Sequence, residues 1–397
     1  MARFKYNIFI AIAALFLIGS GIYIICNRNA RANEDEHTDL MLWYIKGDDL
    51  HDGFADIAKQ FNSNDTTIGR TDIDVSTRGF ASFEKLQAAL KTEDKEDLPD
   101  MISCSVNQAA LLDSMGYIVN CSNYIEDWNE EEFNTDFIDC ATLDRRLIAV
   151  PYAANVELMI VNKDVFPESY EVGSIEALCE QSGYYYFHRE KALFSINDYA
   201  QFFKTAMAQL GEDFNAVNPR YSDSENCKKI YNLIAQTAYD RGFVSCDDPV
   251  SAVINGDIAC AIVSASDIME YAGKLDRNIK IYECPRMENG RQVYSLEVDG
   301  ICICNTDNGR QKAVAEFIKW FTYKEINHGF VSDTGYIPAV GDMSAISSGY
   351  SVYNQVKNVI NNLSTKYEHT DYPPNADYAK NYSEFTDSMQ LVMDSLS

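Results

Sequence analysis

The chain has little positive charge. Its 397 residues include 33 lysines and arginines against 60 aspartates and glutamates, which gives a formal net charge of −27 at pH 7. A surface this acidic repels the phosphates of nucleic acids and the headgroups of anionic membranes, so we expect no nucleic acid partner. The same charge favours solubility and weakly concentrates cations near the protein.

Signatures of catalysis and metal binding are also missing. The five histidines are scattered, and the sequence has no Cys-x-x-Cys pair, phosphate-binding loop or dinucleotide fingerprint. Ser82 and Lys85 have the Ser-x-x-Lys spacing of penicillin-recognising enzymes, but the companion motifs are absent. Ser82 is well explained as a helix N-cap. We therefore predict no enzymatic activity, no cofactor and no metal.

The eleven cysteines follow no recognisable disulfide framework. Cys260, Cys302 and Cys304 lie in apolar, strand-like runs, where a cysteine packs as a small hydrophobic residue. We expect mostly free, buried thiols. A disulfide between Cys104 and Cys121 remains an alternative, because exported chains can form disulfides.

The N-terminus combines a basic start with a long apolar run. Arg3 and Lys5 precede the 19 residues 8–26, a pattern typical of an export signal or a membrane anchor. We expect residues 1–32 to be a signal peptide or an N-terminal membrane anchor, which is cleaved, lipidated at Cys26 or retained. The protein would then lie on the extracellular face of the cytoplasmic membrane, or otherwise be secreted.

The remaining stretch of about 365 residues is long enough for two domains. It holds 29 basic residues against 60 acidic ones, a formal charge of −31. Apolar strand-like runs alternate with amphipathic helical patterns, which predicts an α/β fold with βαβ units and a largely parallel sheet. The runs that we expect to be strands are 40–45, 73–77, 98–103, 147–152, 158–163, 258–263, 279–284 and 300–304.

Short motifs between residues 40 and 340 resemble, in order, those of the family 1 extracellular solute-binding proteins, which are the receptor subunits of sugar-type ABC importers. The most specific match joins residues 147–152 (LIAVPY) to residues 160–166 (IVNKDVF), similar to the family pattern I-Y-G-L-P-Y…L-Y-Y-N-K-D-L-F. Residues 98–101 (LPDM) resemble the family's P-D strand, and residues 334–338 (TGYIP) resemble its T-G-Y-L-P loop.

This resemblance implies a two-lobed, periplasmic-binding-protein-like fold of type II with a hinge between the lobes. Residues 38–153 and 297–325 would form lobe 1, and residues 157–296 and 326–397 would form lobe 2. The function that it implies is a monomeric receptor of an ABC importer. The receptor would capture a small polar solute, a sugar or oligosaccharide, by hinge closure and deliver it to the ABC permease subunits.

Nine residues near the expected strand ends and hinge crossings are candidate ligand-binding residues, because ligands of open α/β sheets lie beyond the carboxyl ends of the strands. Trp43 can stack on a sugar face or pack in the core, and Asn107 can bind ligand or cap a helix. The nine candidates are Trp43, Asp48, Asn107, Tyr152, Asn155, Glu157, Ser266, Asp267 and Tyr336.

Other functions stay open at this stage. The charge of −31 favours a cationic ligand such as a polyamine or a basic peptide. A secreted hydrolase acting on glycans and a binding module for a membrane sensor are further alternatives. The sequence also departs from the family pattern, because residues 264–267 (SASD) stand where the family has a glycine-rich stretch ending in tryptophan. A sugar-stacking ring is therefore missing there.

Overall fold

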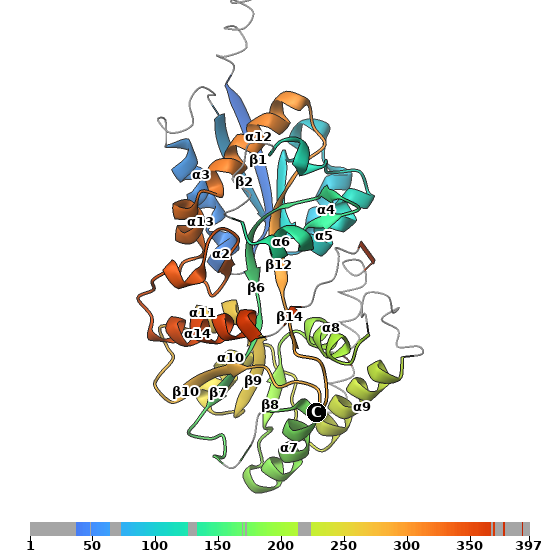
Figure 1. Cartoon of the computed structure of the whole chain (residues 1–397), viewed down its shortest axis with the longest axis vertical. Coiled ribbons are helices and arrows are strands. Elements are labelled where there is room, and N and C mark those ends of the chain that lie inside the picture. Colours follow the sequence, from blue (N-terminus) through green and yellow to red (C-terminus); the bar gives the residue numbers. More distant parts are fainter. Residues whose placement is uncertain are drawn as a thin grey trace, which may run out of the picture.

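The computed structural model describes residues 37–47, 49–63, 73–125, 133–168, 170, 173–212, 224–366, 368–369, 376–377 and 391. It contains two main sheets, with strand orders β13-β6-β12-β3-β1-β2 and β10-β7-β9-β8. The two sheets and their helices form two lobes, one above the other along the long axis of the molecule (Figure 1). The expected α/β fold with two lobes is confirmed.

Lobe 1 is built on the six-stranded sheet. Its strands are β1 (Thr38–Ile45), β2 (Ile73–Phe80), β3 (Met101–Ser105), β6 (Val150–Asn155), β12 (Glu297–Ile303) and β13 (Ile337–Pro338). Its helices are α2 (Asp49–Asp52), α3 (Phe54–Asn62), α4 (Phe83–Thr92), α5 (Val106–Ser114), α6 (Thr135–Cys140), α12 (Asn308–Phe321) and α13 (Lys324–Val331), with a small hairpin of β4 (Thr142–Leu143) and β5 (Arg146–Leu147).

Alternation along β1 explains how this sheet is covered on both faces. Leu40, Leu42 and Tyr44 point into one core cluster, and Trp43 between them points into another. Successive side chains of a strand point to opposite faces, so α3 and α12 cover one face of the sheet and α4 covers the other. Both faces of β1 are therefore buried.

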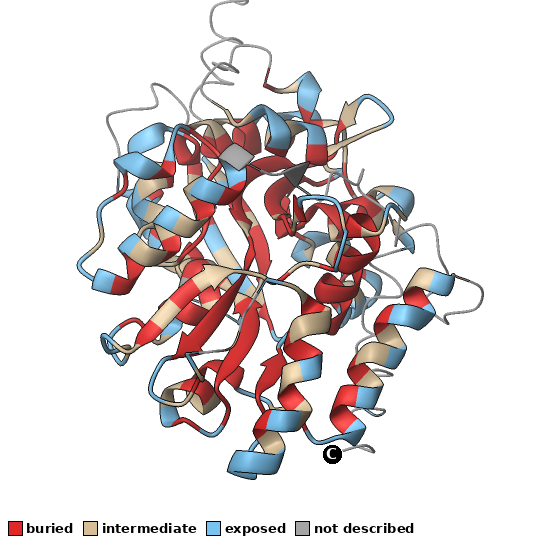
Figure 2. Cartoon of the chain, turned by 60° about the horizontal axis from the view of Figure 1, so that its bottom comes forward, coloured by how far each residue is buried: buried red, intermediate tan, exposed pale blue. Residues whose placement is uncertain are grey.

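Lobe 2 is built on the four-stranded sheet. Its strands are β7 (Glu157–Asn162), β8 (Phe194–Ile196), β9 (Cys260–Ser264) and β10 (Ile279–Glu283), with the short pair β11 (Val293–Tyr294) and β14 (Glu368–His369) nearby. Its helices are α7 (Ile175–Arg189), α8 (Tyr199–Gln209), α9 (Glu225–Tyr239), α10 (Pro249–Asn255), α11 (Ala265–Glu270) and α14 (Ser351–Lys366). Figure 2 shows buried strands at the centre and helices that expose their outer faces.

The expectation of a largely parallel sheet is wrong. β1 pairs in parallel with β2 and β3, but β12 is antiparallel to both β3 and β6, and β7 is antiparallel to both β9 and β10. The reason is topological. β12 runs from lobe 2 into lobe 1, whereas β3 and β6 run toward lobe 2. Their directions are therefore opposite.

Two neighbouring strands connect the lobes. β6 continues through Val156 directly into β7, and β12 begins at Glu297 after Ser295 and Leu296. Asn155 pairs with Glu297 in the β6–β12 ladder, so the two crossings lie side by side (Figure 1). The chain therefore passes between the two main sheets at residues 155–157 and again just before residue 297.

The expected lobe boundary at residue 325 differs from the observed packing. β13 pairs with β6 in the first sheet, and Asn327 of α13 donates a hydrogen bond to the Tyr152 carbonyl oxygen at 2.8 Å. Phe330 of α13 also contacts the Phe54 and Phe321 rings. The chain therefore stays with lobe 1 through β13. After β13 it packs against lobe 2 through α14, which contacts β10 and α11.

The ten cysteines that the structure describes are all free thiols. Cys104 does not pair with Cys121. Its Sγ atom lies 3.9 Å from that of Cys302 across the β3–β12 ladder. Burial raises the pKa of the Cys121 thiol to about 12.

The expected export segment, residues 1–32, lies outside the described residues. None of the helices that the structure does describe has the length and apolarity needed to cross a bilayer.

Candidate functional site

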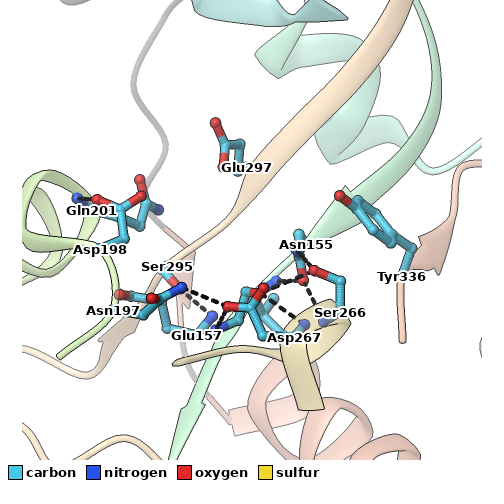
Figure 3. A pocket seen from close by; sticks show the side chains of 12 residues that line it. Asn155, Glu157, Asn197, Asp198, Gln201, Ser266, Asp267, Ser295, Glu297 and Tyr336 are labelled. Atoms are coloured by element: carbon cyan, nitrogen blue, oxygen red, sulfur yellow. Dashed lines mark hydrogen bonds between the residues drawn. The ribbon is translucent and has the colours of Figure 1, made fainter. Parts of the chain in front are cut away.

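A polar pocket lies beside the two crossing strands (Figure 3). Its volume is ≈ 220 Å³. The walls come from the β6–β7 crossing, the start of β12, the turns that precede α8 and α11, and the loop before β13. The lining residues are Asn155, Val156, Glu157, Asn197, Asp198, Gln201, Ser264, Ser266, Asp267, Ser295, Glu297 and Tyr336.

Five of the nine residues expected from the sequence line this pocket. They come from three separate segments of the chain, namely Asn155, Glu157, Ser266, Asp267 and Tyr336. The fold thus brings the β6–β7 crossing, the turn after β9 and the loop before β13 to one place. Ligand contact by these five residues stays a prediction.

Asn155 organises the pocket wall. Its Nδ2 donates a hydrogen bond to Ser266 Oγ at 2.8 Å, and its Oδ1 accepts from the Val156 amide at 3.0 Å. The Ser266 amide also points to the Asn155 Oδ1 atom, at 3.4 Å. Because each end of the amide group is engaged, Asn155 fixes the position of α11 relative to the crossing strand.

The turn before α11 is held by a capping box. Ser264 Oγ accepts a hydrogen bond from the Asp267 amide at 3.1 Å, and Asp267 Oδ2 accepts from the Ser264 amide at 3.3 Å. Asn197 Nδ2 donates to the same Asp267 oxygen at 2.8 Å. This reciprocal pattern satisfies amides at the helix start, so Asp267 has a structural role as well as a place in the pocket.

The opposite wall is the beginning of α8. Asp198 caps this helix, since its Oδ1 accepts from the Gln201 amide at 2.9 Å. The Gln201 side chain is buried, and its Nε2 has no hydrogen-bond partner among the described residues. An unpaired buried amide nitrogen is available as a donor to a bound solute.

Glu157 and Glu297 have unusual environments. Glu157 is only 8% exposed, and burial, with the nearby Asp198 and Glu297 carboxylates, raises its pKa well above the usual range. Burial, followed by Asp299 and Asp198, raises the pKa of Glu297 to about 7, against the opposing influence of Lys204 and His51. Desolvation and like charges both disfavour the ionised carboxylate.

Trp43 does not face the pocket. Its side chain is fully buried in lobe 1, with its ring centroid 4.7 Å from that of Phe80 and the Arg78 guanidinium 5.1 Å from its centroid. Because no ring face is open to a solute, the structure corrects the expectation of stacking and supports the alternative of core packing.

Two further candidates also lie elsewhere, and a third is not among the described residues. Tyr152 is fully buried, and its hydroxyl lies 2.9 Å from Ser103 Oγ and 3.1 Å from His51 Nε2. Asn107 is buried in the first turn of α5, whose N-cap is Ser105 rather than Asn107. Neither residue lines the pocket. Asp48 lies outside the described residues.

Sequence reasoning missed several pocket residues. Asn197 and Asp198 precede an apolar run that begins at Tyr199. An Asp in that position is a helix-cap signal, and it could have marked this helix start as a wall of the site. Ser295 and Glu297 lie on either side of the expected lobe boundary at residues 296–297, but neither is among the nine candidate residues. Their roles depend on strand pairing across more than a hundred residues, which local patterns do not reveal.

Comparison with models of protein families identifies the family of this chain. Residues 56–358 match the family model described as bacterial extracellular solute-binding protein. The match covers most of the chain, including both lobes and both crossing strands, so the protein belongs to this family.

Solved structures share the fold. The GacH receptor of Streptomyces glaucescens, solved unliganded and with acarbose, has 13% identity and a TM-score of 0.71, with 91% of this chain and 95% of that chain covered. The cyclic α-maltosyl-1,6-maltose binding protein of Arthrobacter globiformis has 14% identity and a TM-score of 0.69, with the same coverage. An ABC substrate-binding protein of Listeria monocytogenes in complex with cycloalternan has 14% identity and a TM-score of 0.70, again with 91% and 95% covered.

At these identities the likeness establishes a shared two-lobed fold. Comparison with curated proteins gave no match.

Proposed function

We propose that the protein is the receptor of an ABC importer and captures a carbohydrate between its two lobes. The observation that carries this proposal is the position of the pocket, which lies where the lobes join and draws polar side chains from both. Sugar hydroxyls both donate and accept hydrogen bonds, and the lining offers carboxylates, amides, serine hydroxyls and the Tyr336 ring. Acarbose, cycloalternan and the cyclic maltosyl-maltose bound by structural neighbours are all consistent with this ligand class.

The mechanism that we propose is hinge closure. A solute that contacts Tyr336 from lobe 1 and Ser266 or Asn197 from lobe 2 has more contacts when the lobes are together. It therefore shifts the population toward the closed form. The permease subunits would recognise that form, and no bond of the solute is made or broken. We also propose that the receptor acts as a monomer on the extracellular face of the membrane, anchored by its N-terminal segment.

A thermal-shift screen of linear and cyclic gluco- and manno-oligosaccharides tests the ligand class, since binding to the native state raises the melting temperature. We expect a subset of saccharides to stabilise the protein. Tyr336→Ala should reduce that stabilisation, whereas Tyr323→Ala, at an exposed ring outside the pocket, should leave it unchanged. Failure of every saccharide to shift the melting temperature would contradict the proposal.

Chromatography of the solute after long incubation separates a receptor from a hydrolase. Complete recovery of the unchanged saccharide is expected. Cleavage of many equivalents would instead favour the glycan hydrolase that the sequence left open.

A further inference from the structure

We propose that the solute carries a protonated amino group, which binds on the acidic side of the pocket, to which Glu157 and Glu297 contribute, while its hydroxyl groups occupy the rest of the pocket. The ligand class is then an aminated saccharide. The saccharide part of this inference rests on the proposed function, whereas the cation site rests on the pocket itself.

The first observation is an excess of carboxylates. Four acidic residues line the pocket, namely Glu157, Asp198, Asp267 and Glu297, and the lining includes no lysine, arginine or histidine. Asp198 and Asp267 are explained by the structure because Asp198 caps α8 and Asp267 completes the capping box whose N-cap is Ser264 in front of α11. Glu157 and Glu297 cap no helix, and neither forms an ion pair with a described residue.

The second observation is an unpartnered oxygen. The Glu157 side chain is more than nine-tenths buried, lines the pocket, and has no hydrogen-bond partner for Oε1 among the described residues. A buried carboxyl oxygen without a partner is unfavourable. A ligand ammonium group would supply the missing partner. Figure 3 shows Glu297 apart from the hydrogen-bonded group formed by Asn155, Ser266 and Asp267.

The surrounding charges favour a cation. Glu157 is influenced by Asp198, Glu297 and Asp267, and Glu297 is influenced by Asp299 and Asp198. The opposing positive groups are Lys204 for both carboxyls and His51 for Glu297. Acidic groups therefore outnumber basic groups around the pair, and neither basic residue lines the pocket.

The binding affinities of an aminated solute and of a neutral sugar should change in opposite directions with pH. Burial and like charges hold a proton on these carboxyls, with the pKa of Glu297 at about 7. An incoming ammonium group would displace that proton, so binding would release protons and strengthen as the pH rises toward 7, the range in which the amine is still protonated. A neutral sugar that accepts a hydrogen bond from the protonated carboxyl would bind more weakly as the pH rises.

Three disaccharides that differ only at C2 test this inference: the β-1,4 disaccharide of glucosamine, N,N′-diacetylchitobiose and cellobiose. Calorimetry at a pH of about 5 and of about 6.5, in two buffers of different ionisation heat, reports affinity and proton release together in a range where the sugar amine still carries its proton. We expect the free amine to bind at least about 10-fold more tightly than either neutral partner at the higher pH. Putrescine and spermidine serve as amines without sugar hydroxyls.

Matched variants locate the cation. Glu157→Gln and Glu297→Gln should each abolish most of the preference for the amine, whereas Glu84→Gln, on an exposed helix position outside the pocket, should preserve it. Both pocket variants remove a carboxylate that burial disfavours, so thermal unfolding should show folded proteins at least as stable as the parent at high pH.

The outcomes distinguish the two proposals. Equal or tighter binding of cellobiose and N,N′-diacetylchitobiose would overturn the cation site and leave the carbohydrate receptor intact. Binding of putrescine or spermidine without any saccharide would support the cation site and overturn the carbohydrate receptor. Absence of binding by every aminated probe, or a preference that survives both glutamine variants, would overturn the inference.

Discussion

Asn155, at the end of the strand that leaves lobe 1, donates a hydrogen bond from Nδ2 to Ser266 Oγ at 2.8 Å, in the first turn of α11 in lobe 2. The same side chain accepts from the Val156 amide, within the crossing itself. One amide group therefore connects the crossing strand to the pocket wall, so the orientation of lobe 2 and the shape of the pocket depend on the same contacts.

Ser266→Ala should lower the free energy of unfolding by about 1–2 kcal/mol, because it leaves the partly buried Asn155 Nδ2 without its acceptor. The midpoint of urea unfolding measures the change. Ser63→Ala is the control, since Ser63 is exposed and its Oγ donates to a backbone carbonyl at the end of a helix. Equal effects of the two substitutions would argue against a structural role for the Asn155–Ser266 bond.

Glu297→Gln should stabilise the protein relative to the parent, and this difference in unfolding free energy should grow as the pH rises. The pKa of Glu297 is raised from 4.5 to about 7, so the folded state holds a proton that the unfolded state releases between these values. The unfolding free energy of the parent therefore falls across this window and levels off above it. The variant lacks this titration and should gain about 1–3 kcal/mol relative to the parent above pH 7.

Urea unfolding at a series of pH values tests this prediction. The gain should vanish below a pH of about 4.5, where both states of the parent are protonated. A constant difference at every pH would mean that Glu297 does not titrate in this window.

Trp43→Ala should lower the unfolding free energy by about 3–5 kcal/mol, because it opens a cavity in the core of lobe 1. Ligand affinity should stay within about twofold of the parent value under conditions where the variant is folded, since the ring lies outside the pocket. Calorimetry and urea unfolding on the same preparation separate the two effects. A large loss of affinity with little loss of stability would restore Trp43 to the binding site.

Gly335→Ala should disturb the contact between the lobes. Gly335 has φ of +81°, and a Cβ atom there would lie 2.6 Å from the Ala265 carbonyl oxygen of α11. Both the backbone strain and the clash oppose the substitution, so we expect a loss of about 1–3 kcal/mol in unfolding free energy and weaker solute binding. Gly329→Ala, where a Cβ would meet no atom within 4 Å, is the control.

The sequence supports the fold class because the relevant signals are local. The alternating apolar residues of β1 and the apolar run of β9 identify strands without reference to the rest of the chain. The P-D motif has a structural explanation, since Asp100 is 1% exposed and forms a bidentate ion pair with Arg310 of α12. Residues with such fixed partners support a family resemblance even at low identity.

The site was only partly predictable because its residues meet through long-range packing. Asn155, Glu157, Ser266 and Asp267 could be proposed from strand ends and hinge positions. Trp43 satisfied the same strand-end rule, but period-two alternation put its ring on the face covered by α4. Glu297 carries no local signal at all, and its importance appears only when β12 pairs with β6.

The paired crossings also limit how the lobes can move. Two strands joined by a hydrogen-bonded ladder bend as a ribbon and resist independent swivelling, so lobe motion is reduced to about one bending mode. Glu297 and Asn155 face each other on that ribbon, close to the pivot. A solute bound at this pair contacts the ribbon itself, whereas a solute contact at Asn197 acts on the start of α8, which belongs to lobe 2. We therefore expect the proposed cation contact and the proposed closure of the lobes to depend on different residues of the same pocket.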